Sequence, residues 1–183
     1  MSNLPRPRRT AFDDDWENFV DRVGELLQKS LSAKSKLSPY DEPSAVLKRM
    51  TYKFMIRFQN VNPSVISTSI ENHRINVENR KNAKEFKRLR AMRKPYKGNE
   101  AHWILTGLNS SFNDPHFFEG VNYTLESSDI TRFSAQLHYA FRHSVPPEFL
   151  IGFLYQCGTV QEISAKARNP KVFERWFKPS RAS

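Results

Sequence analysis

The sequence has little cysteine and no long apolar run, and each absence excludes a class of protein. Its single cysteine, Cys157, excludes an internal disulfide and a cysteine-rich zinc site, so we expect a reducing compartment. No apolar run approaches the roughly 18 residues needed to span a bilayer. The basic residues between Met1 and Arg9 are not followed by the apolar stretch of an export signal. We therefore expect a cytoplasmic protein that neither spans a membrane nor is exported.

The signatures of catalysis and of cofactor binding are also missing. Six glycines are few for a phosphate-cradling loop, and neither Gly-x-x-x-x-Gly-Lys nor Gly-x-Ser-x-Gly occurs. His138 and His143 are five positions apart, which points them to different sides of a helix. The run Asp13-Asp14-Asp15 is explained by the start of a helix, and Cys157 lies in an apolar segment where a thiolate would be costly. We expect no enzyme, no cofactor and no bound metal.

What the sequence does have is segregated charge. The net charge of +10 is concentrated in residues 1–10 with +3, residues 74–97 with +8 and residues 166–181 with +5, which leaves −6 for the rest. Such segregation is typical of a protein that binds a polyanion. The central segment is the candidate RNA-binding site, through Arg74, Arg80, Lys81, Lys84, Lys87, Arg88, Arg90, Arg93, Lys94 and Lys97.

Hydrophobic periodicity predicts a mainly helical protein. Residues 16–31 carry apolar side chains at helical spacing after the aspartate run, and residues 127–141 do so after the capping sequence Ser127-Ser128-Asp129. Residues 44–61 fit a helix and a strand equally well, and Pro43 favours the helix because proline is tolerated in the first turn.

Residues 96–124 lack clear periodicity. The stretches 101–108 and 121–125 resemble short strands that flank a loop, which predicts a small β-hairpin. The aromatic residues of this region, Trp103, Phe112 and Phe117, are candidates for stacking on nucleic-acid bases.

The predicted organisation is a flexible basic arm at 1–12, a single globular domain at 13–178 that includes the basic segment 74–97, and a tail at 179–183. Near its end, residues 148–155 are almost continuously apolar, so this run is expected to be a buried helix or a contact between subunits. We expect a homo-oligomer formed through residues 148–177.

Two stretches carry a resemblance. The predicted helix from Glu17-Asn18-Phe19 to Leu27-Gln28-Lys29, and the stretch from Tyr123 through Ser127-Ser128 to Phe133, are similar to parts of the small Alu-domain subunits of the eukaryotic signal recognition particle. If residues 49–59 were a strand, the order α-β-β-β-α of that family would follow, with a C-terminal helical extension. This resemblance implies a subunit of a cellular ribonucleoprotein.

The charge pattern and the apolar C-terminal half favour a different hypothesis. We expect a non-enzymatic RNA-binding protein, with RNA favoured over DNA, that neutralises phosphates without reading sequence and self-assembles as a nucleocapsid or coat-like subunit, which would associate it with a virion. A third hypothesis is a matrix-type protein that binds anionic membrane surfaces through the same basic residues.

Overall fold

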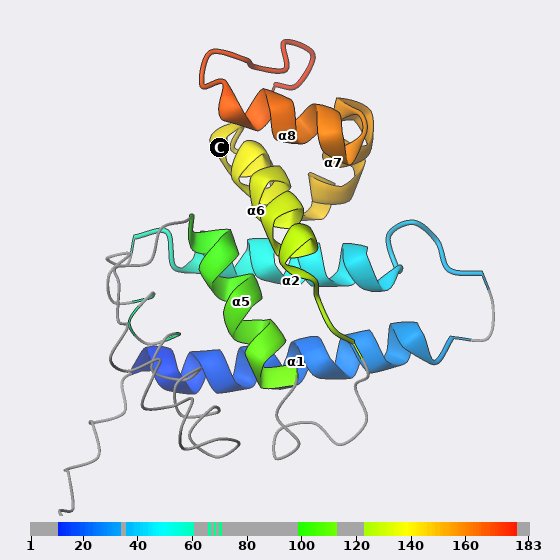
Figure 1. Ribbon diagram of the computed structural model, residues 1–183, viewed down its shortest axis with the longest axis vertical. Coiled ribbons are helices and arrows are strands. Elements are labelled where there is room, and N and C mark those ends of the chain that lie inside the picture. Colours follow the sequence, from blue (N-terminus) through cyan, green and yellow to red (C-terminus); the bar gives the residue numbers. More distant parts are fainter. Residues whose placement is uncertain are drawn as a thin grey trace, which may run out of the picture.

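The protein is mainly α-helical. The computed structural model describes residues 11–33, 36–60, 66, 68, 70, 99–112 and 123–178, and within them no strand is found. The helices are α1 (Ala11–Leu31), α2 (Pro43–Arg57), α5 (Glu100–Phe112), α6 (Ser127–Arg142), the short 3₁₀-helix η1 (Pro147–Phe149), α7 (Leu150–Cys157) and α8 (Val160–Arg168). Figure 1 shows α1 and α2 side by side, α5 crossing both, α6 packed against α2 and α5, and α7 and α8 at the far end of α6.

Helices α1 and α2 pack through aromatic side chains. Phe19 of α1 stacks on Phe54 of α2 with ring centres 4.2 Å apart, and Trp16 meets Phe54 edge-on at 5.7 Å. Asp15 pairs with Arg57 at 2.6 Å at the same end. The helix predicted after the aspartate run is confirmed, although it begins at Ala11, so that the aspartates lie inside its first turns and not ahead of it.

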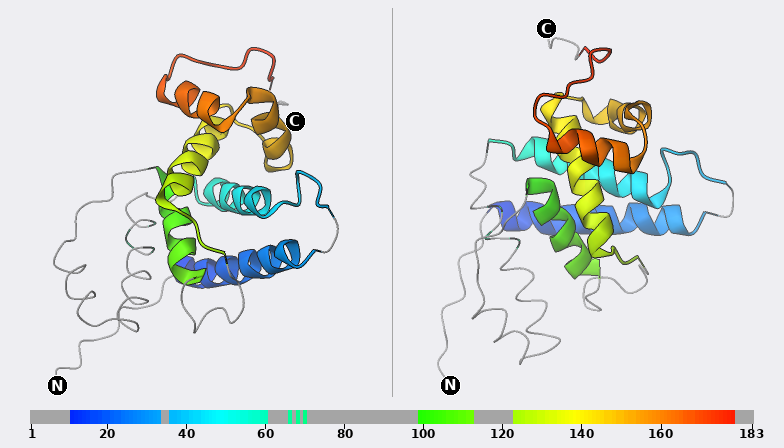
Figure 2. Two further views of the ribbon diagram at one scale, coloured as in Figure 1. Left: turned by 45° about the vertical axis from the view of Figure 1, so that its right-hand side comes forward. Right: turned by 45° about the horizontal axis from the view of Figure 1, so that its top comes forward.

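Helices α5 and α6 form the second layer, which packs against α2 (Figure 2). The core between the layers is made of fully buried aliphatic and aromatic side chains. These include Val20, Val23, Leu27, Leu47, Tyr52, Ile104, Leu105, Leu108, Leu137 and Tyr139. Burial of this apolar surface is the main force that holds the helices together.

The ambiguous stretch 44–61 is helical up to Arg57, as Pro43 in the first turn favoured. The strand at 49–59 that the α-β-β-β-α alternative needs is therefore absent, and that alternative is wrong for this part of the chain.

The predicted β-hairpin is also not formed in the described residues. Its first stretch, 101–108, lies within α5, and residues 123–126 form no regular element. The buried residues Ala101, Ile104, Leu105, Leu108 and Phe112 follow helical spacing. Helical burial of one face outweighed the strand preference of Trp103 and Ile104, since β-propensity depends strongly on context.

The apolar C-terminal run is a buried helix. Helix α7 buries Leu150, Ile151, Phe153, Leu154 and Cys157 inside the chain itself. Of this region, Phe149 and Tyr155 remain exposed. The structure therefore explains most of the apolar run without a partner subunit.

Candidate nucleic-acid interface

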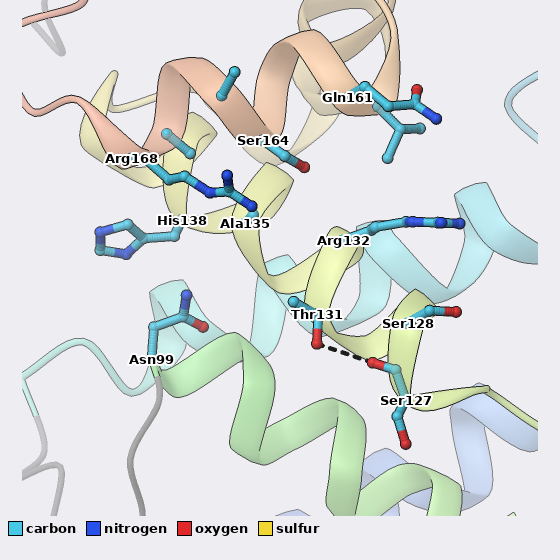
Figure 3. Close-up of a pocket in the computed structure, with 13 residues that line it drawn as sticks. Asn99, Ser127, Ser128, Thr131, Arg132, Ala135, His138, Gln161, Ser164 and Arg168 are labelled. Atoms are coloured by element: carbon cyan, nitrogen blue, oxygen red, sulfur yellow. Dashed lines mark hydrogen bonds between the residues drawn. The ribbon is translucent and has the colours of Figure 1, made fainter.

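A groove runs between α6 and α8 and encloses about 770 Å³ (Figure 3). Most of its lining residues carry hydroxyl, amide or cationic groups, but the surface that they present to the groove is mostly apolar. The lining residues are Asn99, Ser127, Ser128, Thr131, Arg132, Ala135, His138, Val160, Gln161, Ser164, Ala165, Ala167 and Arg168. None of these residues is acidic.

One wall of the groove is a single face of α6. Thr131, Ala135 and His138 recur at intervals of three or four residues, which places them along one side of a helix. The Thr131 hydroxyl donates a 2.9 Å hydrogen bond to the carbonyl oxygen of Ser127. Arg132 lies 4.0 Å from Asp129, and both side chains are exposed, so the arginine stays available to a ligand.

The opposite wall is α8, whose start is fixed by a capping box. The Thr159 side chain accepts a hydrogen bond from the backbone N–H of Glu162, and the Glu162 carboxylate accepts one from the Thr159 backbone at 2.6 Å. The hydrogen bond from the Thr159 backbone, together with the Thr159 side chain, lowers the pKa of the Glu162 carboxylate. Gly158, with a φ of 114°, turns the chain into this cap in a conformation that suits glycine. The cap sets the position of Ser164 and Arg168 along the groove.

Asn99 closes the groove at the start of α5. Its side-chain oxygen accepts a 3.0 Å hydrogen bond from the His102 backbone, and its amide donates one of 3.3 Å to the Ser134 carbonyl. Asn99 follows Lys97, the last member of the basic segment, by two positions in the sequence. The chain that carries the basic segment therefore enters the described structure at the groove.

The groove has the composition of a phosphate-contacting surface. Arginine, serine, threonine, asparagine and glutamine side chains are among the groups that contact nucleic-acid phosphates and sugars. The described histidine, cysteine and acidic side chains form no group of three or more that could hold a metal ion. The groove can bind an anion by charge and by hydrogen bonds from its hydroxyl and amide groups.

The residues predicted from sequence to bind RNA, from Arg74 to Lys97, lie outside the described residues, and so does Phe117. The other two stacking candidates are described and are core residues, because Trp103 is 8% exposed and Phe112 is 5% exposed. Their side chains are largely covered in this structure, and base stacking by Trp103, Phe112 and Phe117 stays a prediction. The sequence analysis did not identify Arg132, because a single arginine on a helix gives no local signal.

A second feature, a network around Glu174, ties the C-terminal segment to α6 and α8. The Glu174 carboxylate pairs with Lys166 at 2.8 Å and accepts hydrogen bonds from the Tyr139 hydroxyl and the Trp176 indole N–H, each at 2.9 Å. Burial opposes ionisation, but these three partners together lower the pKa of Glu174. The same carboxylate raises the pKa of Lys166.

His143 joins the network from α6. Its Nε2 accepts a 2.9 Å hydrogen bond from the Glu174 backbone N–H, while Nδ1 faces the Tyr139 carbonyl oxygen at 2.8 Å. These partners require the neutral ring with its proton on Nδ1. The residues after α8 are thus held in a defined place although they form no regular element.

Comparison with known proteins gives no relative. No protein-family model matches the chain, and neither curated proteins nor solved structures show a significant match. Among the helices that the structure describes, none is both long and apolar enough to cross a bilayer.

Proposed function

We propose that this protein binds RNA without reading its sequence and assembles as a nucleocapsid or coat-like subunit, with no catalytic role. The single observation that carries the proposal is the groove between α6 and α8, whose lining has no acidic residue, presents Arg132 and Arg168, and includes Asn99, two positions after the basic segment in the sequence. The groove and the basic residues of 74–97 would each contact phosphates. Contacts of this kind neutralise phosphates but carry no sequence information.

Self-assembly is supported by complementary charge. Helix α1 holds six carboxylates against two basic residues, and the basic segment of a second copy would complement it. Because α7 buries most of the apolar run at 148–155, the proposed subunit contact through residues 148–177 would use aromatic side chains that remain exposed, and within that run these are Phe149 and Tyr155. The protein would then act in the cytoplasm and in a virion.

The first experiment measures the salt dependence of RNA affinity. The slope of log K against log salt is negative, and each lost phosphate contact on single-stranded RNA makes it shallower by about 0.7. We expect Arg132→Gln and Arg168→Gln each to make the slope shallower by about 0.7. Arg22→Gln is the matched control, because Arg22 lies on α1 in an exposed pair with Glu25 and should leave the slope unchanged.

The second experiment tests the basic segment and the assembly together. Charge reversal of Lys84, Lys87 and Arg88 should abolish RNA binding while circular dichroism shows an unchanged helical signal. Light scattering of nuclease-treated protein should show particles that grow with the length of the added RNA. A monomer that ignores random RNA contradicts the proposal. Preference for one structured RNA would then indicate a cellular ribonucleoprotein subunit, and binding to anionic vesicles a matrix-type protein.

A further inference from the structure

Two aromatic rings near the C-terminus are exposed yet held in place. Phe173 is 54% exposed and Trp176 is 48% exposed, whereas the other two tryptophans, Trp16 and Trp103, are buried. Exposed rings of this size on an ordered segment leave apolar surface in water, and such surfaces commonly bind a ligand.

Both rings rest on one support. The Phe173 ring packs on His143 at 4.9 Å between ring centres, and the Trp176 ring packs on Phe153 at 5.7 Å. The two supporting rings are themselves 5.3 Å apart. Arg142 adds a second contact to Phe173, with its guanidinium 5.3 Å from the ring centre. The rings are therefore positioned before any ligand arrives, which reduces the entropy cost of binding.

The Glu174 network also controls the charge of this surface. Glu174 is the only acidic residue in the sequence from 163 to 183, and Lys166 pairs with it at 2.8 Å. The other cations here are exposed, and in the described part of the chain none of them forms an ion pair. They are Arg168, Lys171, Arg175 and Lys178.

We infer that Phe173 and Trp176 form a platform on which the bases of single-stranded RNA stack, while Lys171, Arg175 and Lys178 contact its phosphates. This inference rests on the proposed function and names the form of RNA that it favours. Exposed aromatic rings interleaved with cations are the combination by which single-strand binders hold bases without sequence preference. A second copy is a poor occupant of the same surface, because face-to-face docking would bring its cations against these.

The experiment uses the full chain and two RNA probes, a short oligoadenylate and a duplex of the same length. In a duplex the bases are already stacked on each other, so the platform should act on the single strand alone. Tryptophan fluorescence of the wild type should be quenched by the oligoadenylate, since Trp176 is the tryptophan open to it. The variant Phe173→Leu/Trp176→Leu should lose about tenfold or more in affinity for oligoadenylate and little for the duplex.

The matched control is Tyr40→Leu, which removes an aromatic ring that is 47% exposed ahead of α2, far from the C-terminal cations in the sequence. It should bind both probes as the wild type does. Circular dichroism melting shows whether each variant folds. If the double variant does not fold, quenching of the wild-type tryptophan fluorescence by oligoadenylate still tests the platform.

The outcomes separate the platform from the proposed function. If the wild type binds neither probe, the proposed function fails and the platform fails with it. If the wild type binds both probes but shows no quenching, and the double variant binds oligoadenylate equally well, the platform is overturned and the proposed function stands. If the double variant loses only self-association, or only binding to anionic vesicles, the surface serves a subunit or a membrane and the inference is overturned.

Discussion

The hydroxyl of Tyr52 donates a 2.7 Å hydrogen bond to the carbonyl oxygen of Val145, which lies 93 positions later in the sequence. The bond joins the middle of α2 to the turn after α6, and the Tyr52 side chain is fully buried. It therefore holds the first layer of helices against the end of the chain that carries α7 and α8.

We expect Tyr52→Phe to destabilise the protein by about 1–2 kcal/mol, because the Val145 carbonyl would be left buried without its partner. The measurement is the free energy of unfolding from urea denaturation. Tyr155→Phe, on an exposed ring, is the control and should change it by less than about 0.5 kcal/mol. Equal effects of the two substitutions would contradict the importance of the buried bond.

Glu174→Gln should destabilise the C-terminal segment. The variant loses the negative charge that pairs with Lys166 and accepts a hydrogen bond from the Tyr139 hydroxyl. We expect its free energy of unfolding to fall by about 1–3 kcal/mol. Because the folded state lowers the pKa of Glu174, its contribution is present above the ordinary pKa of a glutamate and is lost as the pH falls through and below that value.

The wild type should therefore lose more stability than Glu174→Gln between about pH 5 and pH 3. Thermal melts at a series of pH values measure this difference. Parallel pH profiles for the two proteins would show that the carboxylate is not stabilised by its partners.

Lys48 is expected to cost stability at neutral pH. Its ammonium lies 4.3 Å from the centre of the Phe133 ring, and burial lowers its pKa to about 8 in spite of the nearby Glu42 and Asp129. Because the unfolded chain holds this proton more tightly than the folded one, stability should rise as the pH increases from about 8 towards 10.

Lys48→Met should raise the free energy of unfolding by about 1–2 kcal/mol at pH 7 and remove that rise. Lys53→Met, at an exposed position of the same helix, should do neither. A destabilised Lys48→Met protein would mean that the contact of the ammonium with Phe133 and its attraction to the two carboxylates outweigh its desolvation.

Gly107 permits the close approach of α5 to α1. A Cβ at this position would lie 2.6 Å from Ile70 Cγ2 and 2.8 Å from the Trp16 ring, and both neighbours are buried. Gly107→Ala should therefore destabilise the protein by about 1–3 kcal/mol, even though alanine favours helices. In Gly152→Ala the nearest atom is the Tyr40 hydroxyl at 3.3 Å, on an exposed side chain that can move. That variant should be neutral or slightly more stable. Thermal melts of both variants measure the difference, and equal melting temperatures for Gly107→Ala and Gly152→Ala would contradict the prediction.

Cys157 should be inert in the folded protein. The thiol is buried, and burial together with the charge of Glu174 raises its pKa to about 12, so very little thiolate exists at pH 8. Mass spectrometry after iodoacetamide treatment should show almost no alkylation of the native protein and full alkylation in denaturant. Comparable rates in the two conditions would contradict the buried placement of α7.

Several features of the fold could be predicted from local pattern. The helix of Trp16, Phe19, Val20 and Val23 and the helix that follows Ser127 were predicted because their apolar residues recur at helical spacing next to recognisable start signals. The buried state of the run in α7 was foreseen as one of two outcomes. In α5 the same helical spacing exists at Ala101, Ile104, Leu105 and Leu108. The strand preference of Trp103 and its neighbours nevertheless led to the prediction of a strand.

The candidate site was less accessible to sequence analysis. Arg132 and Arg168 are 36 positions apart, and only the packing of α6 against α8 brings them to one groove. Likewise, nothing local distinguishes the tryptophan that is buried in α5 from the one that is exposed after α8. Exposure depends on which distant elements cover a side chain.

The sequence by itself determined the helical character of the chain and the segregation of its positive charge, because periodicity and charge are properties of neighbouring residues. The tertiary structure decided which aromatic rings are core and which face water, which cations share a groove, and that Glu174 neutralises Lys166 and leaves the surrounding cations exposed. Those outcomes depend on contacts between residues far apart in the chain, where burial and pairing are settled by the packing of whole helices.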